Sequence, residues 1–251
     1  MRQIVMDTAT KALSVALLED NEVVAQWTTV GSKQHGALLV SVIQQLMQQI
    51  AWEPKQIDEI LVGVGPGSYT GVRVAVTVAK TWADSLAIPL KQVSSLALIA
   101  AQVPVQIACN DAQLIVPLMD ARRLSAYTGA YRYQDGQLVS VIADCHADWQ
   151  QWLGQLQTQL HSESRLVLIG DNIAEFEQLT RAALDCEIQV ISGWESLPHT
   201  DKVGRVVKQE VADPALLVPA YANLTVAEQE WLAKQTEDEQ NGVQAFIHYI
   251  S

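Results

Sequence analysis

Cysteine and histidine are scarce in this sequence, and it contains no long apolar run. The three cysteines, Cys109, Cys145 and Cys186, are scattered and lack Cys-x-x-Cys spacing, so we expect neither a disulfide framework nor a zinc knuckle. The five histidines are dispersed and form no pair suited to a metal. No segment reaches about 18 uninterrupted apolar residues, and Asp7 comes too early for a signal-peptide core. A soluble, cytoplasmic protein without membrane contact is therefore expected.

Basic residues are few relative to acidic ones. The chain has 16 Lys and Arg against 28 Asp and Glu, a formal net charge of −12. Affinity for nucleic acids depends largely on cations that neutralise phosphates, so the chain alone is expected to bind RNA or DNA weakly. Acidity that merely keeps a protein soluble is the commoner explanation. The 251 residues, 49% hydrophobic and 18% charged, suffice for one large or two modest globular domains.

A repeated pattern of apolar strands is present instead. Residues 4–30, IVMDTATKALSVALLEDNEVVAQWTTV, read as three strands separated by two turns, an antiparallel meander. Residues 115–141 show the same order when Met6-Asp7 is aligned with Met119-Asp120. This self-similarity predicts duplication of one supersecondary unit, with coincidence as the alternative because strand–Asp–turn patterns are common.

Helical spacing of apolar residues predicts the other elements. Helices are expected over residues 34–51 and 70–86, with a short apolar strand ending in glycines between them. Another strand ends at Gly170, and the helix after it is expected to be capped near Asp171. One more helix is expected to begin near Thr200 and to stop before Pro214.

The stretch GVGPGSYTGVRVAVTVAK, residues 63–80, resembles a phosphate-binding loop but lacks its chemistry. A P-loop has Gly-Lys-Ser or Gly-Lys-Thr at its end, whereas Gly71 is followed by Val72 and Arg73. A hydrolase nucleophile elbow requires Gly-x-Ser-x-Gly, but Pro66 and Thr70 stand at the glycine positions around Ser68. Neither a P-loop nor a catalytic serine is therefore predicted.

What remains is a strand-to-helix turn. Gly65 and Gly67 free the backbone, Ser68 or Thr70 can cap the helix, and Gly71 allows another segment to come close. The amides of such a helix start attract anions. In the helix, Ala75, Ala79 and Ala83 form a smooth ridge for close contact, either within the fold or with a partner. Spacing alone favours packing of this ridge within the fold. The family resemblance given below indicates instead a ridge that is shared between the core and a partner.

Five segments together resemble a known family. MDTAT, QHGALLVSVIQQL, GVGPGSYTGVRVAVTVAKTWADSLAIPLKQVSSL, LMDARRLSAYTGAY and VPAYANL are similar to segments of the TsaB family, also called YeaZ. The match covers residues 1–135 and the late VPAYANL segment, and the Gly-Pro-Gly-Ser-Tyr-Thr-Gly block is its specific part. Ala222-Asn223 stands where the family usually has Leu-Arg, so the resemblance assigns no role of that arginine to this chain.

The resemblance implies an α/β fold of the actin-like, sugar-kinase-like ATPase class (ASKHA), with two duplicated domains built of a β-meander and helices. Residues 1–103 would form the N-terminal actin-like domain with the partner-binding helices, and residues 104–225 a second, degenerate one. Residues 226–251 would form a C-terminal tail, whose order the sequence leaves open.

The resemblance also implies a function. Family members are non-catalytic scaffolds that dock on TsaD and TsaE in the complex that transfers a threonylcarbamoyl group to N6 of the adenosine beside the tRNA anticodon. A homodimer is expected when the chain is alone. No tightly bound cofactor is expected, and ATP or ADP would have a place only at the interface with a partner.

Two sets of residues follow from these expectations. The resemblance places the partner interface on the two N-terminal helices, at His35, Leu39, Val42, Ile43, Thr70, Val72, Arg73, Val76, Ala79, Lys80 and Ala83. Residues that could lie near an anion or nucleotide are Asp7, Thr8, Thr10, Gly65, Gly67 and Ser68.

No catalytic or metal-binding residue is expected. TsaD-type chains carry two histidines one helical turn apart to hold a metal, and in this sequence Ser95 and Ile99 stand at those positions. An alternative is an active small-molecule kinase of the same fold, in which Asp7 lies near a metal and Asp120 acts as a base. Asp7 could equally cap its own turn. Peptidase activity is disfavoured because the sequence has no metal pair, Ser–His–Asp order or activated cysteine.

Overall fold

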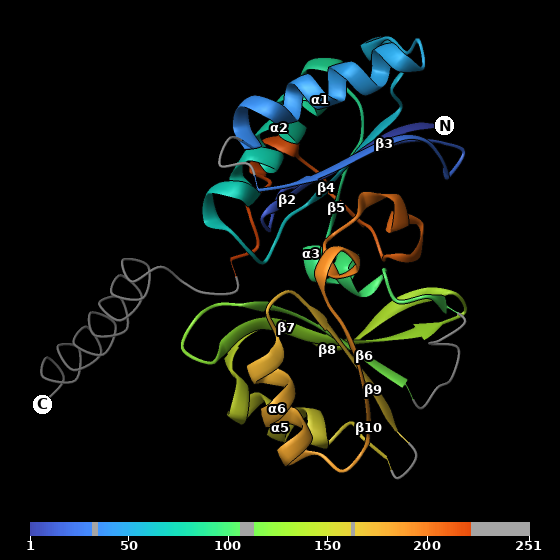
Figure 1. Cartoon of the computed structure of the whole chain (residues 1–251). Coiled ribbons are helices and arrows are strands. Elements are labelled where there is room, and N and C mark those ends of the chain that lie inside the picture. Colours follow the sequence, from blue (N-terminus) through green and yellow to red (C-terminus); the bar gives the residue numbers. More distant parts are fainter. Residues whose placement is uncertain (32–34, 106–112, 162–163, 222–251) are drawn as a thin grey trace, which may run out of the picture.

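The computed structural model describes residues 1–31, 35–105, 113–161 and 164–221, and shows two mixed β-sheets on either side of one short helix (Figure 1). Helices α1 and α2 cover the outer face of the first sheet, and α5 and α6 cover the outer face of the second. Helix α3, Ser95–Ala100, lies between the sheets. The molecule is therefore layered as helices, sheet, helix, sheet and helices.

The first sheet contains the expected N-terminal meander. Its six strands lie in the order β11-β5-β4-β1-β2-β3. Strands β1 to β3 pair antiparallel, whereas β4 and β5 run parallel to β1. The bounds are β1 Arg2–Asp7, β2 Ala12–Glu19, β3 Glu22–Val30, β4 Glu59–Gly63, β5 Leu90–Val93 and β11 Gln209–Glu210, with α1 at His35–Gln49 and α2 at Tyr69–Leu86.

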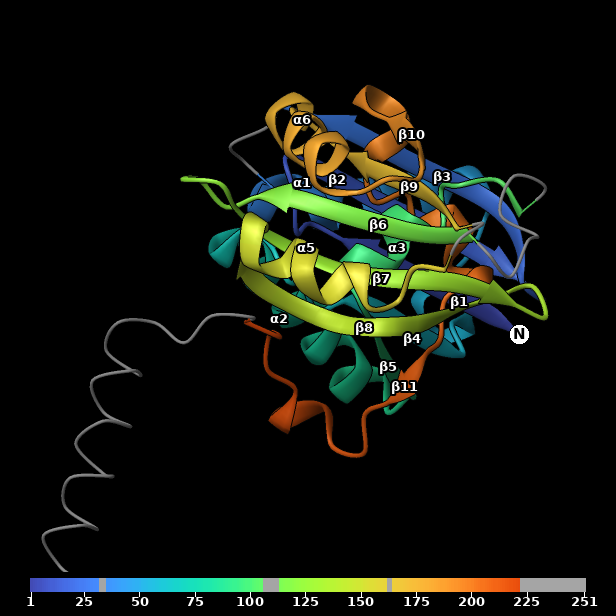
Figure 2. The same ribbon diagram turned by 90° about the horizontal axis from the view of Figure 1, so that it is seen from below.

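The second sheet repeats this topology. Its order is β10-β9-β6-β7-β8, which matches β5-β4-β1-β2-β3 strand for strand. Figure 2 shows α5 and α6 lying across this sheet. The bounds are β6 Gln113–Asp120, β7 Ser125–Gln134, β8 Gln137–Asp148, β9 Arg165–Gly170 and β10 Glu187–Ile191, with α5 at Trp149–Gln157 and α6 at Ala174–Ala183. The predicted duplication is confirmed.

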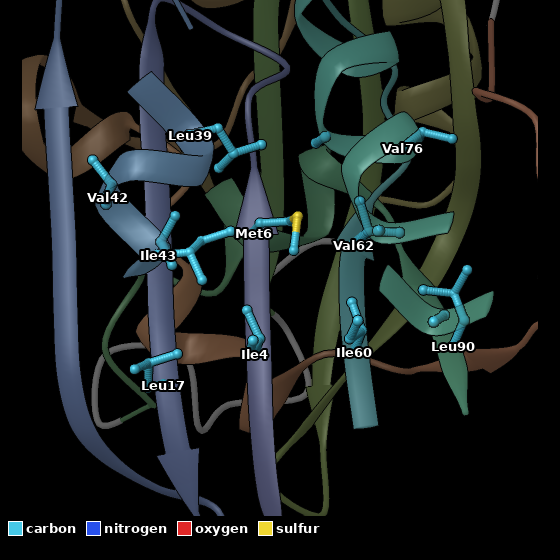
Figure 3. Packing of buried hydrophobic residues seen from close by; sticks show 14 of the residues in the cluster. Ile4, Met6, Leu17, Leu39, Val42, Ile43, Ile60, Val62, Val76 and Leu90 are labelled. Carbon is cyan, nitrogen blue, oxygen red and sulfur yellow. The ribbon is translucent and has the colours of Figure 1, made fainter. Parts of the chain in front are cut away.

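Alternation along the strands explains why both faces of each sheet are covered. In β1, Ile4 and Met6 point to the layer of α1 and α2, where Figure 3 shows them among Leu39, Ile43 and other apolar side chains. Val5, between them, points to the opposite face and joins the core around α3. A strand buried on both faces reads as a continuous apolar run, as this one does.

Helix α3 joins the two halves through a shared core. All six of its residues are buried. Its side chains share one apolar cluster with Leu61 of the first sheet and with Ile115 and Val167 of the second. Burial of apolar surface on both sides of one helix is the main favourable term that holds such layers together. The two sheets are therefore built around α3.

The C-terminal part of the described chain returns to the first sheet. Strand β11 pairs with β5, and Ala220 N donates to Val64 O at 2.8 Å. Lys80 Nζ on α2 donates to the carbonyls of Ala215 (2.6 Å) and Leu217 (2.9 Å). The expected unit 104–225 thus contributes to the first sheet, and the domain boundary at residue 103 stays a prediction. The tail 226–251 lies outside the described residues.

Two local predictions were wrong. The helix expected from Thr200 to Pro214 is a 3-10 helix over Thr200–Arg205 followed by extended chain. Val206 is buried in the α3 core and forms an isolated bridge with Leu138, so tertiary contacts override the local helical pattern. The other error concerns α6, whose N-cap is Ile173 and not Asp171.

The alanine ridge of α2 lies entirely inside the chain. Ala75, Ala79 and Ala83 are all buried against the first sheet and α1. The ridge is therefore a packing surface, and no part of it is exposed for a partner.

This packing gives a stability prediction. Ala79→Leu should destabilise the fold by about 1–3 kcal/mol, because extra methylenes do not fit into a filled core. The measurement is urea unfolding, with the midpoint expected to fall at an unchanged slope. Ser85→Leu, an exposed position on the same helix, is the matched control and should change the midpoint little. Equal effects of the two variants would contradict the assigned packing.

Candidate functional site

A cleft of about 1000 Å³ opens where the two halves meet on one side of α3. We call it the front cleft. Its walls come from the β1–β2 turn, the glycine loop before α2, the β6–β7 turn and the segment after β9, and include Thr10, Ser68, Asp120 and Asp171. Turn and loop segments from both repeats therefore line the same cleft.

The glycine loop of residues 63–71 is clamped to the β1–β2 turn. Ser68 N donates to Ala9 O at 2.6 Å, and Thr8 Oγ1 donates to Gly71 O at 2.6 Å. A Cβ at Gly67 would lie 2.3 Å from Ala9 O, and one at Gly71 would lie 2.1 Å from Thr8 O. The backbone of the turn thus occupies the space that these glycines leave. The glycines serve close packing of two loops.

The start of α2 is capped from within the chain. Ser68 is the N-cap residue, and its hydroxyl accepts a hydrogen bond from Gly71 N at 3.3 Å. This confirms one of the two expected caps, while Thr70 is exposed and lines the front cleft. Together with the Ser68 N bond to the β1–β2 turn, the cap uses amides that a phosphate would need.

Asp7 is buried at the end of β1, directly before the β1–β2 turn. Its side chain is 0% exposed and is absent from the residues lining the front cleft. Oδ1 accepts from Ala9 N at 2.9 Å, and Oδ2 accepts from the Ser95 hydroxyl at 2.5 Å. Burial raises the pKa of Asp7 above its ordinary value, and the hydrogen bonds from Ser95 and Ala9 act in the opposite direction. Asp7 therefore caps its own turn.

Gly63 makes room for this carboxylate. A Cβ at Gly63 would lie 1.8 Å from Asp7 Oδ2 and 3.0 Å from Ser95 Oγ. Ser95 also accepts from Gly65 N at 3.1 Å, and its own N donates to Gly65 O at 2.9 Å. Strand β1, the glycine loop and α3 are thus joined at one buried point.

Ser95 and Ile99 occupy the positions that the family resemblance aligns with a metal-binding histidine pair. The Ser95 hydroxyl is engaged by Asp7, and Ile99 lines the front cleft with an aliphatic side chain. An aliphatic side chain has no atom that can coordinate a metal. Among residues 1–31, 35–105, 113–161 and 164–221, no three His, Cys, Asp or Glu side chains are grouped to hold an ion.

Three charged side chains at the front cleft, those of Lys11, Asp120 and Asp171, have partners on the chain, whereas Arg122 lines the cleft with an exposed side chain. Lys11 of the first half forms an ion pair with Asp171 of the second, which bridges the cleft mouth. Asp120 accepts from Arg122 N at 2.7 Å and so caps the β6–β7 turn. Asp7 and Asp120, which a kinase reading would use together, do not line the same space.

The residues expected at a partner interface divide into two groups. Most are buried within this chain: Leu39, Val42, Ile43, Val72, Val76, Ala79 and Ala83. Thr70 and Arg73 are exposed, and Lys80 is half-buried against the C-terminal segment. His35 is the first residue of α1, and its side chain lies outside the described part. Among the members of this set whose side chains the structure describes, only Thr70 and Arg73 are exposed.

A surface cluster that the sequence did not reveal surrounds Arg73. Its guanidinium carbon lies 4.1 Å from the centre of the Tyr69 ring, and its Nε donates to Tyr221 OH at 2.7 Å. The Tyr69 and Tyr221 rings stack with centroids 5.0 Å apart, and Tyr69 is 47% exposed. We call Tyr69, Arg73 and Tyr221 the arginine–tyrosine cluster. Tyr69 and Arg73 lie one helical turn apart on α2, but Tyr221 is far from both in sequence, so no local pattern could indicate the complete cluster.

Comparison with known proteins shows the family of this chain. The TsaD family model, tRNA N6-adenosine threonylcarbamoyltransferase, matches residues 27–246. The tRNA threonylcarbamoyladenosine biosynthesis protein TsaB of Bacillus subtilis is 33% identical over 236 residues, 94% of this chain and 100% of that protein. TsaB of Escherichia coli is 26% identical, over 89% of this chain and 84% of its own. The solved structure of YeaZ from Pseudomonas aeruginosa has a TM-score of 0.68 at 21% identity, covering 88% of this chain and 99% of that one.

The duplicated meander-and-helix halves around a central cleft define an actin-like, sugar-kinase-like ATPase fold of the ASKHA class. Within that class, the chain belongs to the TsaB (YeaZ) family of tRNA threonylcarbamoyladenosine biosynthesis proteins. No helix in the described part of the chain is both long and apolar enough to span a bilayer.

The packing role of the glycine loop predicts opposite effects for two glycine substitutions. Gly71→Ala should destabilise the fold by about 1–3 kcal/mol, because the new Cβ meets the backbone of Thr8. Gly154→Ala is the matched control in helix α5, where a Cβ would meet nothing within 4 Å. It should stabilise by about 0.5–1 kcal/mol through lower chain entropy in the unfolded state. Urea unfolding measures both, and a Gly71→Ala variant as stable as the parent or more stable would refute the clamp.

The buried Asp7 predicts a pH dependence of stability. Its pKa is higher in the folded than in the unfolded state, so the folded state holds the proton more tightly. The resulting contribution to stability is present below the ordinary value of 3.8 and is lost as pH rises through the folded-state pKa.

Asp7→Asn removes this titration. The variant should lose less free energy of unfolding than the parent as pH rises from about 4. The measurement is denaturant unfolding over a pH series, with exposed Asp84→Asn as the control. Parallel pH profiles for Asp7→Asn and the parent would show that Asp7 titrates alike in both states.

Proposed function

We propose that this chain is a non-catalytic partner subunit in the cytoplasmic complex that forms threonylcarbamoyladenosine in tRNA. One observation carries the proposal: the glycine loop donates and accepts its hydrogen bonds within the fold. Ser68 N is bonded to Ala9 O, and the Thr8 hydroxyl to Gly71 O, at the place where a nucleotide phosphate would bind. A catalytic member of the fold needs phosphate-binding groups there.

The replaced metal positions support the same proposal. With Ser95 bonded to Asp7 and Ile99 in the cleft wall, the chain offers no metal site at this place for group transfer. The catalytic subunit would then be a TsaD-type transferase, with TsaE as a further component. A nucleotide, if present, would bind at an interface shared with a partner.

We place the docking surface at the exposed start of α2. The arginine–tyrosine cluster lies there, next to exposed Thr70 and Thr77 on the same helix face. Arginine and tyrosine are enriched among residues that dominate binding energy. The Tyr221 bond holds Arg73 in place, which reduces the entropy lost on docking. In the absence of the transferase, a second copy of this chain would use the same surface.

The net charge is consistent with such a division of labour. At −12, the chain lacks the cations that bind tRNA phosphates tightly. The partners would therefore supply the tRNA-binding surface.

A small-molecule kinase of the same fold is the alternative. The front cleft, with room for a nucleotide and with Asp120 at its wall, is the observation in its favour. Asp7, the expected second acid of such a site, faces Ser95 instead.

Substitution of Arg73 tests the proposal. The parent chain mixed with a TsaD-type transferase should form a heterodimer in size-exclusion chromatography with light scattering. Arg73→Glu should raise the dissociation constant of the heterodimer by about tenfold or more, as expected for a central interface arginine. Thermal unfolding should stay cooperative, because Arg73 is on the surface.

Arg165→Glu is the matched control. Arg165 begins β9 in the second sheet and has an exposed side chain, so the same charge change there should leave association intact. Independent elution of the parent chain and the transferase over a wide concentration range would contradict the partner role. Equal affinity of the parent and Arg73→Glu would remove the cluster from the interface.

A further inference from the structure

A second cleft, of about 580 Å³, opens on the other side of α3. We call it the rear cleft. Ser94 and Ala97 face it from the start of α3, whereas Ile99 of the same helix faces the front cleft. The two clefts share no lining residue, so the rear cleft is a separate space.

One half-buried carboxylate lies in the wall of the rear cleft. Asp144 on β8 accepts from the Ser94 hydroxyl at 2.5 Å and from the Tyr131 hydroxyl on β7. Ser94 is itself held in place as the N-cap of α3, where it accepts from Ala97 N at 3.0 Å. Three elements thus fix the carboxylate.

Asp144 dominates the electrostatics of this cleft. Apart from Tyr131 and Tyr221, it is the only ionisable side chain among the described residues that line the cleft. Burial raises the pKa of Asp144, and burial together with Asp144 raises the pKa of Tyr131 well above its ordinary range. The carboxylate is partly withdrawn from solvent, and no lysine, arginine or histidine lines the cleft with it in the described part of the chain.

The remaining wall is largely apolar. Val93, Leu138 and Val206 line the interior and are buried, while Val207 at the rim is 55% exposed. A largely apolar pocket with a few fixed polar groups is the usual form of a small-molecule site, and the volume lies in the usual range of about 300–1,000 Å³.

We propose that the rear cleft binds a small organic cation, with its ammonium or guanidinium group on Asp144 and its apolar body against the valine and leucine wall. This site goes beyond the partner role proposed above and does not depend on it. A cation would supply a counter-charge to the half-buried carboxylate, whose partners Ser94 and Tyr131 are both hydroxyl groups. A lone carboxylate is a poor site for a divalent metal, which needs several oxygen ligands. An anion would meet only negative charge.

The test compares two probes of nearly the same shape. n-Butylguanidinium carries a positive charge, and n-butylurea replaces it with a neutral group. Titrations of the full chain followed by NMR should show the guanidinium binding at least about tenfold more tightly than the urea, the effect of one charge-assisted hydrogen bond. The shifted resonances should include Ala143 and Val207 at the cleft.

Two variants locate the binding. Asp144→Asn should remove the preference for the guanidinium, whereas Asp135→Asn, at the exposed β7–β8 turn, should retain it. Asparagine tolerates the left-handed conformation at Asp135, which has φ 51°, so this control should fold normally. If Asp144→Asn fails to fold, Ala143→Trp, which fills the cleft from an exposed position, should abolish binding of the guanidinium.

Four outcomes would overturn the proposal. The urea could bind as tightly as the guanidinium, Asp135→Asn could lose binding as fully as Asp144→Asn, or Ala143→Trp could bind as the parent does. Absence of guanidinium binding to the parent chain would have the same force. None of these results bears on association with a transferase.

Discussion

The hydrogen bond between Ser95 and the buried carboxylate of Asp7 is the interaction on which the rest of the structure depends. It ties the end of β1 to the start of α3. Ser95 is also bonded in both directions to Gly65, which fixes the glycine loop at the same point. A buried carboxylate without donors would be strongly unfavourable, so these contacts must form together. They set where α3 lies, and α3 in turn provides the core on which both sheets pack.

The position of α3 divides the space between the two halves into two clefts of different chemistry. In the front cleft, the contacts of the glycine loop are made within the chain, and an ion pair joins the two halves. The rear cleft has one fixed carboxylate in an apolar wall. Under the proposed function, the first space takes no part in chemistry, and the outer surfaces and the second cleft serve binding.

Much of the fold could be predicted from the sequence because its signals are local. Alternation and turn residues gave the meander of β1 to β3, and alignment of Met6-Asp7 with Met119-Asp120 found the repeat. The helix prediction after Thr200 was wrong, because the burial of Val206 and the pairing of Gln209–Glu210 with β5 depend on distant residues. The cap prediction at Ser68 succeeded because capping involves only the helix start.

The candidate site was harder to predict, for a physical reason. Helical periodicity identifies the apolar face of α1 and α2 but does not say whether that face meets the chain itself or a partner. The structure buries Leu39, Ile43 and Ala79 internally and leaves Arg73 outside. Its contacts with Tyr221, and those of Asp144 with Ser94, join residues far apart in sequence. No pattern in one sequence could pair them.

Calorimetric titration of the isolated chain with ATP and Mg²⁺ tests the central claim most directly, namely that the glycine loop is a packing element that has no phosphate-binding role. The account predicts no saturable binding in the micromolar range, because the amide of Ser68 and the hydroxyl of Thr8 are bonded within the fold. Micromolar affinity for ATP on the isolated chain would contradict it and favour the kinase alternative.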